Sequence, residues 1–225
     1  MACLNPTLEW QTREGLVRIQ LERIDGVVLA YNLGHVIFNL NGPVQVALPP
    51  KGIRPQKLRA AWSQAQTSLK LDILGQPAPR DVAIVFNDLQ VWAGENENFS
   101  GPETLVAQYL QINASRRTPN EGTRPDFDIA VQADRAVLRD PSNQSKTLTE
   151  LNRIELLGAV YEVPLLETSS FARMVALWQQ NDGYLDIQRL WLDEGRSAIH
   201  ASGRLALETD GTLTGNAKVS VAGAE

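Results

Sequence analysis

The chain has 225 residues, 43% of them hydrophobic, and a formal net charge of −5 from 21 Lys and Arg against 26 Asp and Glu. This length and composition exclude a disordered polypeptide, and the interspersed, slightly acidic charge argues against a nucleic-acid partner and against binding to anionic lipid head groups. A single cysteine, Cys3, excludes an internal disulfide, and with only two histidines the usual zinc sites cannot be assembled.

Alternating apolar and polar residues predict strands in the first quarter of the chain. The first strand covers Leu16–Val28, with a bend or bulge at Ile24–Gly26. A second strand is predicted over Val36–Leu40, followed by a turn at Asn41–Pro43. A third strand over Val44–Leu48 is ended by Pro49-Pro50, and Lys51–Gln56 is predicted to be a loop.

The segment Leu58–Ile73 changes phase. Leu58 and Trp62 share one parity, whereas Leu69 and Ile73 have the other. A strand that keeps both sets on one face needs a bulge or break, which we place among Gln64–Gln66. A helix over Lys57–Gln66 is the alternative, because Ala and Gln are good helix formers.

The middle of the chain predicts further strands. Alternation is clear in Arg80–Trp92 and Phe127–Asp134, and Leu105–Ala114 fits either state but alternates as a strand does. Among the polar segments between the strands, 94–102 is expected to be a loop, 116–126 a long exposed connection and 140–143 a turn. A longer strand is expected over Thr147–Val163, broken near Gly158.

One amphipathic helix is predicted near residues 169–181. Over Ser170–Gln180 the apolar side chains fall at helical spacing on one face, Thr168 or Ser169 can cap the start, and Gly183 can end it. A strand over Tyr184–Leu192 and a closing hairpin around Asp210-Gly211 complete the pattern.

The elements together predict a mainly β fold. We expect one domain over residues 1–225, with a weak division at 116–126 as the best candidate boundary. The sheet is long, curved and antiparallel, a meander folded into either a half-barrel or a sandwich, with one helix. No stretch approaches 18 apolar residues and the start is unlike a signal peptide, so we expect a soluble chain, compatible with a removed anchor.

No residue cluster predicts catalysis. His35 and His200 lack a neighbouring nucleophile and acid in a recognisable arrangement, so surface or structural histidines are the simpler interpretation. Asp126, Asp128 and Asp134 could form an acid pair, but a solvated strand face is the simpler interpretation. The pair Arg116-Arg117 could bind a phosphate, but an exposed basic loop without a ligand is the simpler interpretation. We therefore expect a protein that is not an enzyme, with no cofactor and no metal.

The aromatic residues suggest a ligand surface. Core packing is the plainer interpretation of the five tryptophans, but a curved sheet with one apolar face needs a second sheet, helices, a partner or a lipid to cover it. The chain offers one helix for this purpose. Trp62, Phe86 and Trp92 are the candidate residues of an apolar groove.

Several segments resemble a bacterial envelope family known as domain of unknown function 2125. They are Ala30–Ile37, Gly42-Pro43, Leu58–Leu71, Leu177-Trp178, Gly183–Leu185, Ile187, Leu190–Leu192, Ala201–Leu207 and Gly211–Gly215. The resemblance implies an exported, β-rich domain behind a short membrane anchor, hence a periplasmic or envelope-associated protein, and we expect the anchor to be absent from this chain. The closing strands are also similar to those of AsmA- and TamB-type envelope proteins, whose grooved sheets carry lipid.

Two functions follow as expectations. The first is a non-enzymatic envelope protein that shelters lipid acyl chains in its curved sheet, for lipid transport or envelope maintenance. The second is an interaction module that binds another envelope protein through a sheet edge. A hydrolase would require a pocket that brings His35 or His200 to an acid and a nucleophile.

Overall fold

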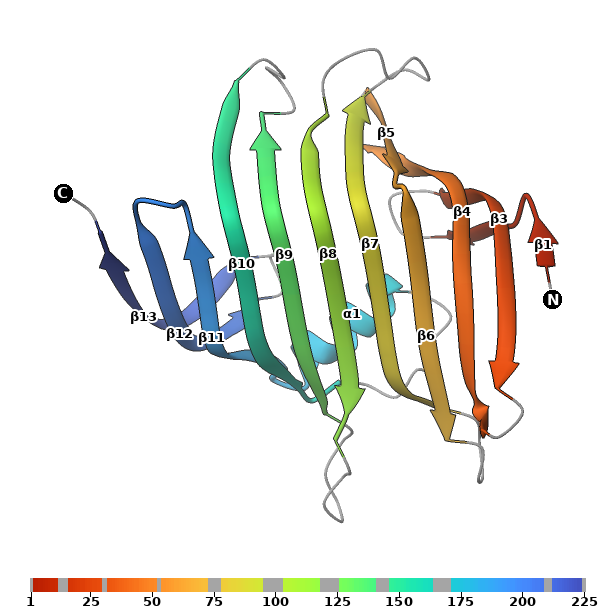
Figure 1. The fold of residues 1–225 in the computed structure, drawn as a ribbon. Coiled ribbons are helices and arrows are strands. Elements are labelled where there is room, and N and C mark those ends of the chain that lie inside the picture. The colour runs from red at the N-terminus through yellow and green to blue at the C-terminus, as the bar shows by residue number, and fades with distance from the viewer. Residues whose placement is uncertain are drawn as a thin grey trace.

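The computed structural model describes residues 2–11, 16–29, 32–51, 54–72, 78–94, 103–117, 126–140, 146–163, 171–208 and 212–223. In these residues thirteen strands form one antiparallel sheet, accompanied by one helix, α1 at Phe171–Gln180 (Figure 1). The strands are β1 Ala2–Leu4, β2 Thr7–Gln11, β3 Leu16–Leu29, β4 Asn32–Lys51, β5 Arg54–Ala61, β6 Gln64–Asp72, β7 Ala78–Gly94, β8 Leu105–Arg116, β9 Phe127–Arg139, β10 Thr147–Tyr161, β11 Tyr184–Asp193, β12 Ala198–Leu207 and β13 Leu213–Ala222.

The strands follow one another as a meander. The order is β1-β3-β4-β5-β7-β8-β9-β10-β11-β12-β13; β2 also pairs with β3, and β6 pairs with β4 and β7. The predicted mainly β fold with a long antiparallel sheet and one helix is confirmed. Among the described residues there is a single sheet and no second layer of strands, so the sandwich alternative is wrong.

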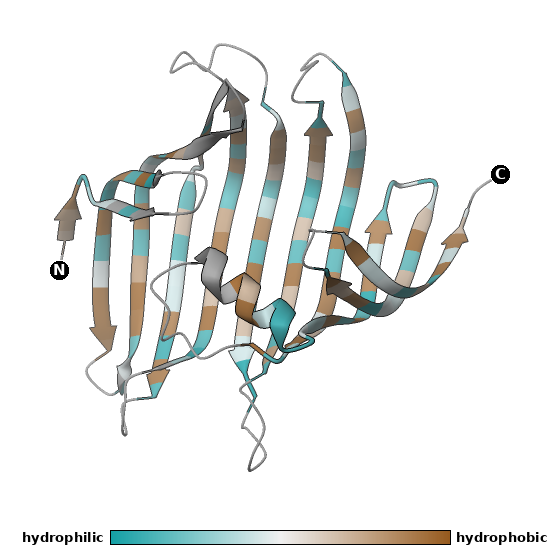
Figure 2. Ribbon diagram, turned by 180° about the vertical axis from the view of Figure 1, so that it is seen from behind, coloured by the Kyte–Doolittle hydropathy of each residue, from teal (hydrophilic) through white to brown (hydrophobic). Residues whose placement is uncertain are grey.

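The sheet is curved and stays open. Seen from behind, its ends turn toward the viewer on either side of α1, which lies within the curve (Figure 2). The outer strands β1 and β2 at one end and β13 at the other do not pair with each other in the part of the chain that the structure describes. A twisted sheet of more than about ten strands must curl, and here the curl produces a trough.

A transverse line of irregular residues, here called the crease, crosses the long central strands. The backbone pairing is interrupted at 88/108 between β7 and β8, at 108/135 between β8 and β9, and at 135/152 between β9 and β10. On either side of each interruption the register of the two strands is the same. Asp88 and Arg135 have positive φ angles of 52° and 49°. The crease side chains are exposed, whereas Leu89 and Ala107 beside them are buried. At the crease, the alternation of side chains between the two faces of the sheet is reversed along each strand. Apolar side chains before and after the crease therefore point to the same face of the sheet.

The crease yields a stability prediction. A left-handed backbone costs a residue with a Cβ about 1–2 kcal/mol, so Arg135→Gly should raise the free energy of unfolding by up to about 1 kcal/mol. The matched control is Arg80→Gly in β7, an exposed residue outside the crease, which should lower it by about 0.5–1 kcal/mol. Urea denaturation of both variants measures the difference; if both changes are destabilising, the crease geometry is wrong.

Three expectations for the first strands are corrected. Asn41–Pro43 is not a turn, because β4 runs through it: Gly42, at φ +80°, adopts a bulge conformation, and Pro43 needs no ladder donor there. The irregularity in β3 lies between Leu21 and Arg23 rather than at Ile24–Gly26. Pro49-Pro50 does not end the strand, since Lys51 still pairs with Arg54, and the predicted loop 51–56 is correspondingly too long.

The predicted break in Leu58–Ile73 is confirmed, but it lies slightly earlier. β5 and β6 form one interrupted strand between β4 and β7, with the interruption at Trp62-Ser63 instead of Gln64–Gln66. The helix alternative is wrong, because both partner strands supply ladder hydrogen bonds that override the local preference for helix. The predicted strand at 105–114 and the irregularity near Gly158 are also confirmed.

The predicted helix is confirmed, although Gly183 acts differently from the expectation. The left-handed residue after α1 is Asp182, at φ +53°, and the Gly183 amide donates to the Trp178 carbonyl at 2.9 Å. A Cβ at Gly183 would lie 2.2 Å from Trp178 Cδ1, so glycine is needed for the close approach of the indole. Several predicted features lie wholly or mostly outside the described residues: the loop after Gly94, at 95–102, residues 118–125 of the connection at 116–126, the turn at 141–143, the cap at 168–169 and the turn at 210–211.

A stack of side chains joins β10 and β11 near the helix. The rings of Tyr161 and Tyr184 stack with centroids 4.6 Å apart, and Arg204 lies 4.1 Å from the Tyr184 centroid. Arg117 donates to Asp128 at 2.8 Å and to the Tyr161 hydroxyl at 3.0 Å. The bond to Asp128, followed by the bond to Tyr161, raises the pKa of Arg117 above its ordinary value.

Candidate apolar binding face

The register of the sheet aligns apolar side chains in two neighbouring rows, each crossing ten strands. Directly paired residues on neighbouring strands share a face, so a chain of pairs defines a row. The first row is Ile24, Leu40, Ala65, Phe86, Leu110, Ala133, Ile154, Leu192, Ile199 and Val221; the second is Gly26, Phe38, Thr67, Ile84, Ile112, Val131, Leu156, Leu190, Ala201 and Val219. Apart from Thr67, both rows are apolar throughout.

We call these two rows the apolar band. Ten strands spaced about 4.8 Å apart extend it over roughly 43 Å along the curve of the sheet. A bulge in β11 maintains the band: the register shifts between Ile187 and Leu190, so the apolar residues before and after the shift lie on the same face. The band is therefore continuous from β3 to β13.

The band is only partly covered by protein. The buried hydrophobic residues among those described are Leu89 and five alanines, Ala65, Ala107, Ala133, Ala136 and Ala159, and no large side chain is fully buried. Ile112, in the middle of the band, is 38% exposed, and Val219 at its end is 58% exposed. In the part of the chain that the structure describes, a single-layer sheet with one helix therefore leaves part of this apolar surface in contact with solvent.

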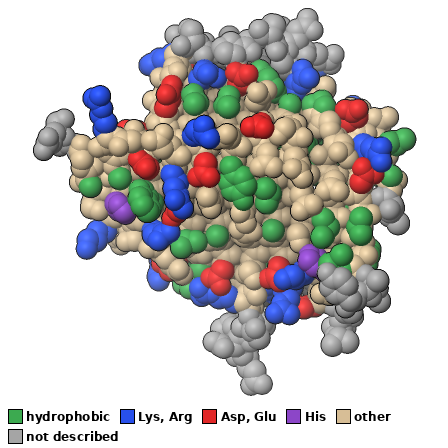
Figure 3. Space-filling view, viewed as in Figure 1, with side chains coloured by type: hydrophobic (Ala, Val, Ile, Leu, Met, Phe, Trp, Pro, Cys, Tyr) green, Lys and Arg blue, Asp and Glu red, His purple; other side chains and the backbone are tan. Residues whose placement is uncertain are grey.

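The opposite face is polar. The row between the two apolar rows, on the other side of the sheet, is Asp25, Asn39, Gln66, Val85, Gln111, Gln132, Glu155, Trp191, His200 and Ser220. Glu155, with a side chain 12% exposed, forms ion pairs with Arg153 and Arg189. The view from the side opposite α1 shows mixed charges, small hydrophobic clusters and both histidines (Figure 3). Since the histidines belong to the polar face, α1 lies over the apolar face.

The structure brings two of the three predicted groove residues together. The rings of Trp62 and Phe86 meet edge to face with centroids 5.2 Å apart, and the Trp62 indole donates to the Leu40 carbonyl at 2.9 Å. Trp92 is not part of this pair. It lies opposite Arg59, whose guanidinium carbon is 5.6 Å from the Trp92 ring centroid. Trp62 and Phe86 thus mark one part of the band.

Sequence reasoning missed most of the band. Ile84, Ile112 and Leu156 are directly paired neighbours at its centre. The alternation within each strand shows which residues share a face. Their alignment into a row depends on the register between strands, which no local sequence pattern supplies.

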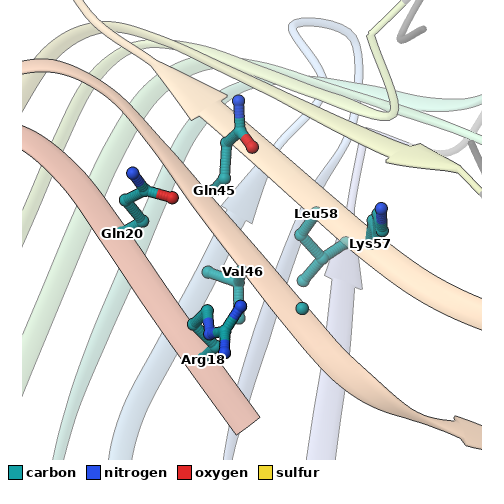
Figure 4. A pocket seen from close by; sticks show the side chains of 7 residues that line it. Arg18, Gln20, Gln45, Val46, Lys57 and Leu58 are labelled. Atoms are coloured by element: carbon teal, nitrogen blue, oxygen red, sulfur yellow. The ribbon is translucent and has the colours of Figure 1, made fainter. Parts of the chain in front are cut away.

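The hollows on the molecule are shallow and partly polar. One of about 140 Å³ lies over β3–β5, where Val46 and Leu58 are surrounded by Arg18, Gln20, Gln45 and Lys57 (Figure 4). Another of about 220 Å³ lies on the polar face between Gln111, Gln132 and Glu155. Some of the polar side chains around them bond to neighbours: Arg18 pairs with Glu9 at 2.5 Å, and Tyr109 donates to Gln111 at 2.5 Å.

The histidines have ordinary structural partners. His35 Nε2 lies 2.7 Å from Ser68 Oγ, a contact between strands that the sequence did not reveal. No carboxylate is a hydrogen-bond partner of His35 among the described residues. His200 stacks on Trp191 with ring centroids 5.3 Å apart. In the same residues, no three His, Cys, Asp or Glu side chains gather as metal ligands.

A family comparison now identifies the chain. The model of the family described as "Uncharacterized protein conserved in bacteria (DUF2125)" matches residues 2–225. The chain belongs to this family. No curated protein and no solved structure matches it. Within the described residues of this DUF2125 member, α1 is the only helix and is too short to cross a membrane.

Proposed function

We propose that this DUF2125 protein is a non-enzymatic carrier or shelter for lipid acyl chains, which bind along the apolar band in the curve of the sheet. The observation that carries the proposal is the continuous apolar row across ten strands, at the centre of which Ile112 is still 38% exposed. Exposed contiguous apolar surface of this extent marks a ligand or partner site rather than ordinary protein surface.

The dimensions suit an acyl chain. The chains in one membrane leaflet span about half of a roughly 30 Å hydrocarbon core, so the band of roughly 43 Å has room for more than one. Each buried methylene contributes about 0.8 kcal/mol, and ten of them would offset an association cost of several kcal/mol. Because this energy comes from the acyl chain, the protein should discriminate little between head groups.

We further propose a periplasmic or envelope-associated location and a membrane anchor outside this chain, as the resemblance to envelope proteins suggested. The similarity of the closing strands to AsmA- and TamB-type proteins belongs with this proposal. Its structural support is the open, one-layer sheet with one apolar face. The alternative, an interaction module, is favoured by one specific observation: β13 is fully exposed and ends the sheet.

The proposal is tested by what the protein carries. The protein is purified from bacterial cells without detergent, its native mass is measured, and an organic extract is analysed by mass spectrometry. We expect lipids with acyl chains in the extract and a matching excess in native mass. A mass equal to that of the polypeptide, together with failure to bind an added fluorescent fatty acid, would remove the proposal.

A further inference from the structure

The last strand of the sheet, β13, presents an edge unlike the opposite one. It is ten residues long, every residue is exposed, and among the residues that the structure describes it pairs only with β12. Leu213, Val219 and Val221 are 67%, 58% and 57% exposed. The strand contains no proline and only one charge, Lys218, on its polar side. Native proteins normally protect such an edge, because its free backbone groups pair readily with another strand.

The opposite edge is protected. It consists of two short strands, β1 and β2, which pair with different parts of β3. Between them, Asn5 has a positive φ of 48° and is followed by Pro6, which has no backbone donor. These features interrupt the row of free backbone groups. A head-to-tail chain of molecules would need both edges, so the asymmetry favours a contact of β13 with itself.

We propose that β13 pairs antiparallel with β13 of a second copy of this chain, around a two-fold axis at Ala217. This register places Leu213 opposite Val221 and Gly215 opposite Val219. It therefore continues the apolar band on one face and the polar residues on the other. It also places Lys218 opposite the neutral Asn216, so the two ammonium groups are not directly opposed.

Neighbouring registers are worse. A shift by one residue places polar side chains opposite apolar ones, because side chains alternate with a period of two. A shift by two residues in one direction puts the axis at Lys218 and brings the two lysines face to face, which is destabilising. A shift by two in the other direction puts the axis at Asn216 and shortens the ladder, because Val221 then has no partner within β13. The contact is one strand wide, well below the roughly 1,200 Å² of a stable interface, so the dimer should depend on concentration.

The inference stands on the edge strand and does not require lipid binding. Cysteine cross-linking tests the register, in a background where the exposed Cys3 is replaced as Cys3→Ser. In Ala217→Cys the two thiols would be directly opposite, with Cα atoms about 5 Å apart, within disulfide range. In the control Val221→Cys they would be eight residues apart along the strands, about 27 Å. Mild oxidation should link the first variant into dimers and leave the second unlinked.

A second measurement uses charge. Sedimentation of the purified chain should show a mass that rises from monomer to dimer with concentration. Ala217→Lys places two ammonium groups opposite each other at the axis, so this variant should remain a monomer at all concentrations. Ser220→Lys places its ammonium group opposite Thr214, so this variant should still form the dimer. Both positions are exposed, so the fold should persist, which circular dichroism checks. Equal cross-linking of both cysteine variants, a monomer at every concentration, or a different polypeptide bound in place of the second copy would overturn the proposal.

Discussion

Replacing Ile112 by aspartate should abolish most acyl-chain binding while the protein stays folded. Ile112 lies at the centre of the apolar band, between Ile84 and Val131, and is 38% exposed. A carboxylate there would lose its hydration against a bound hydrocarbon chain, at a cost of about 1–3 kcal/mol or more. Affinity for a fluorescent fatty acid, measured by titration, should therefore fall by about tenfold to more than a hundredfold.

The neighbouring residue provides a matched control. Asn113 lies on the same strand but on the polar face, where its side-chain oxygen accepts a hydrogen bond from Gln111 at 3.2 Å. Asn113→Asp introduces the same charge with almost the same shape and keeps this acceptor. Fatty-acid affinity should change less than twofold, within the small effect expected of a surface charge. Equal losses in both variants would mean that binding does not occur on the apolar face.

The second large effect concerns stability. Leu89 is 5% exposed and is the one large side chain among the buried hydrophobic residues of the described chain; the others are alanines. It lies directly beside the crease, next to the skipped pair 88/108. Leu89→Ala should lower the free energy of unfolding by about 2–4 kcal/mol, through lost burial and the cavity left behind. Urea denaturation followed by tryptophan fluorescence measures the change.

A leucine at the sheet edge gives the comparison. Leu213 is 67% exposed in β13, so Leu213→Ala should change the free energy of unfolding by less than about 0.5 kcal/mol. A loss of similar size in the two variants would show that the interior of this protein is not concentrated along the crease. The comparison is best made at low protein concentration, where association through β13 does not contribute.

The alternation of Val82, Ile84 and Phe86 suffices to predict a one-sided strand and the face that each residue occupies. The helix over Phe171–Gln180 is equally predictable, because its apolar residues recur at helical spacing. These features are local. A reader of the sequence can therefore assign the fold class and most of the strands.

The crease and the rows are not local. Arg135 shows no sequence signal for its positive φ, and the Asn41–Pro43 segment has the composition of a turn although it continues a strand. Both depend on ladders formed with strands on either side, which override the preferences of the segment itself. Trp62 and Phe86 could be named as groove candidates, but not the alignment of Ile84 with Ile112, which requires the register.

The most direct test of the central claim maps where a bound chain touches the protein. The protein is allowed to bind a fatty acid that carries a photoreactive diazirine near its methyl end, and the complex is irradiated. The labelled residues are then identified by peptide sequencing. Labels are expected on residues of the apolar band, such as Ile84, Ile112 and Leu156, and an excess of unlabelled fatty acid should suppress them. Labels on the polar face around Gln111 and Gln132, or labelling that the competitor does not reduce, would contradict it.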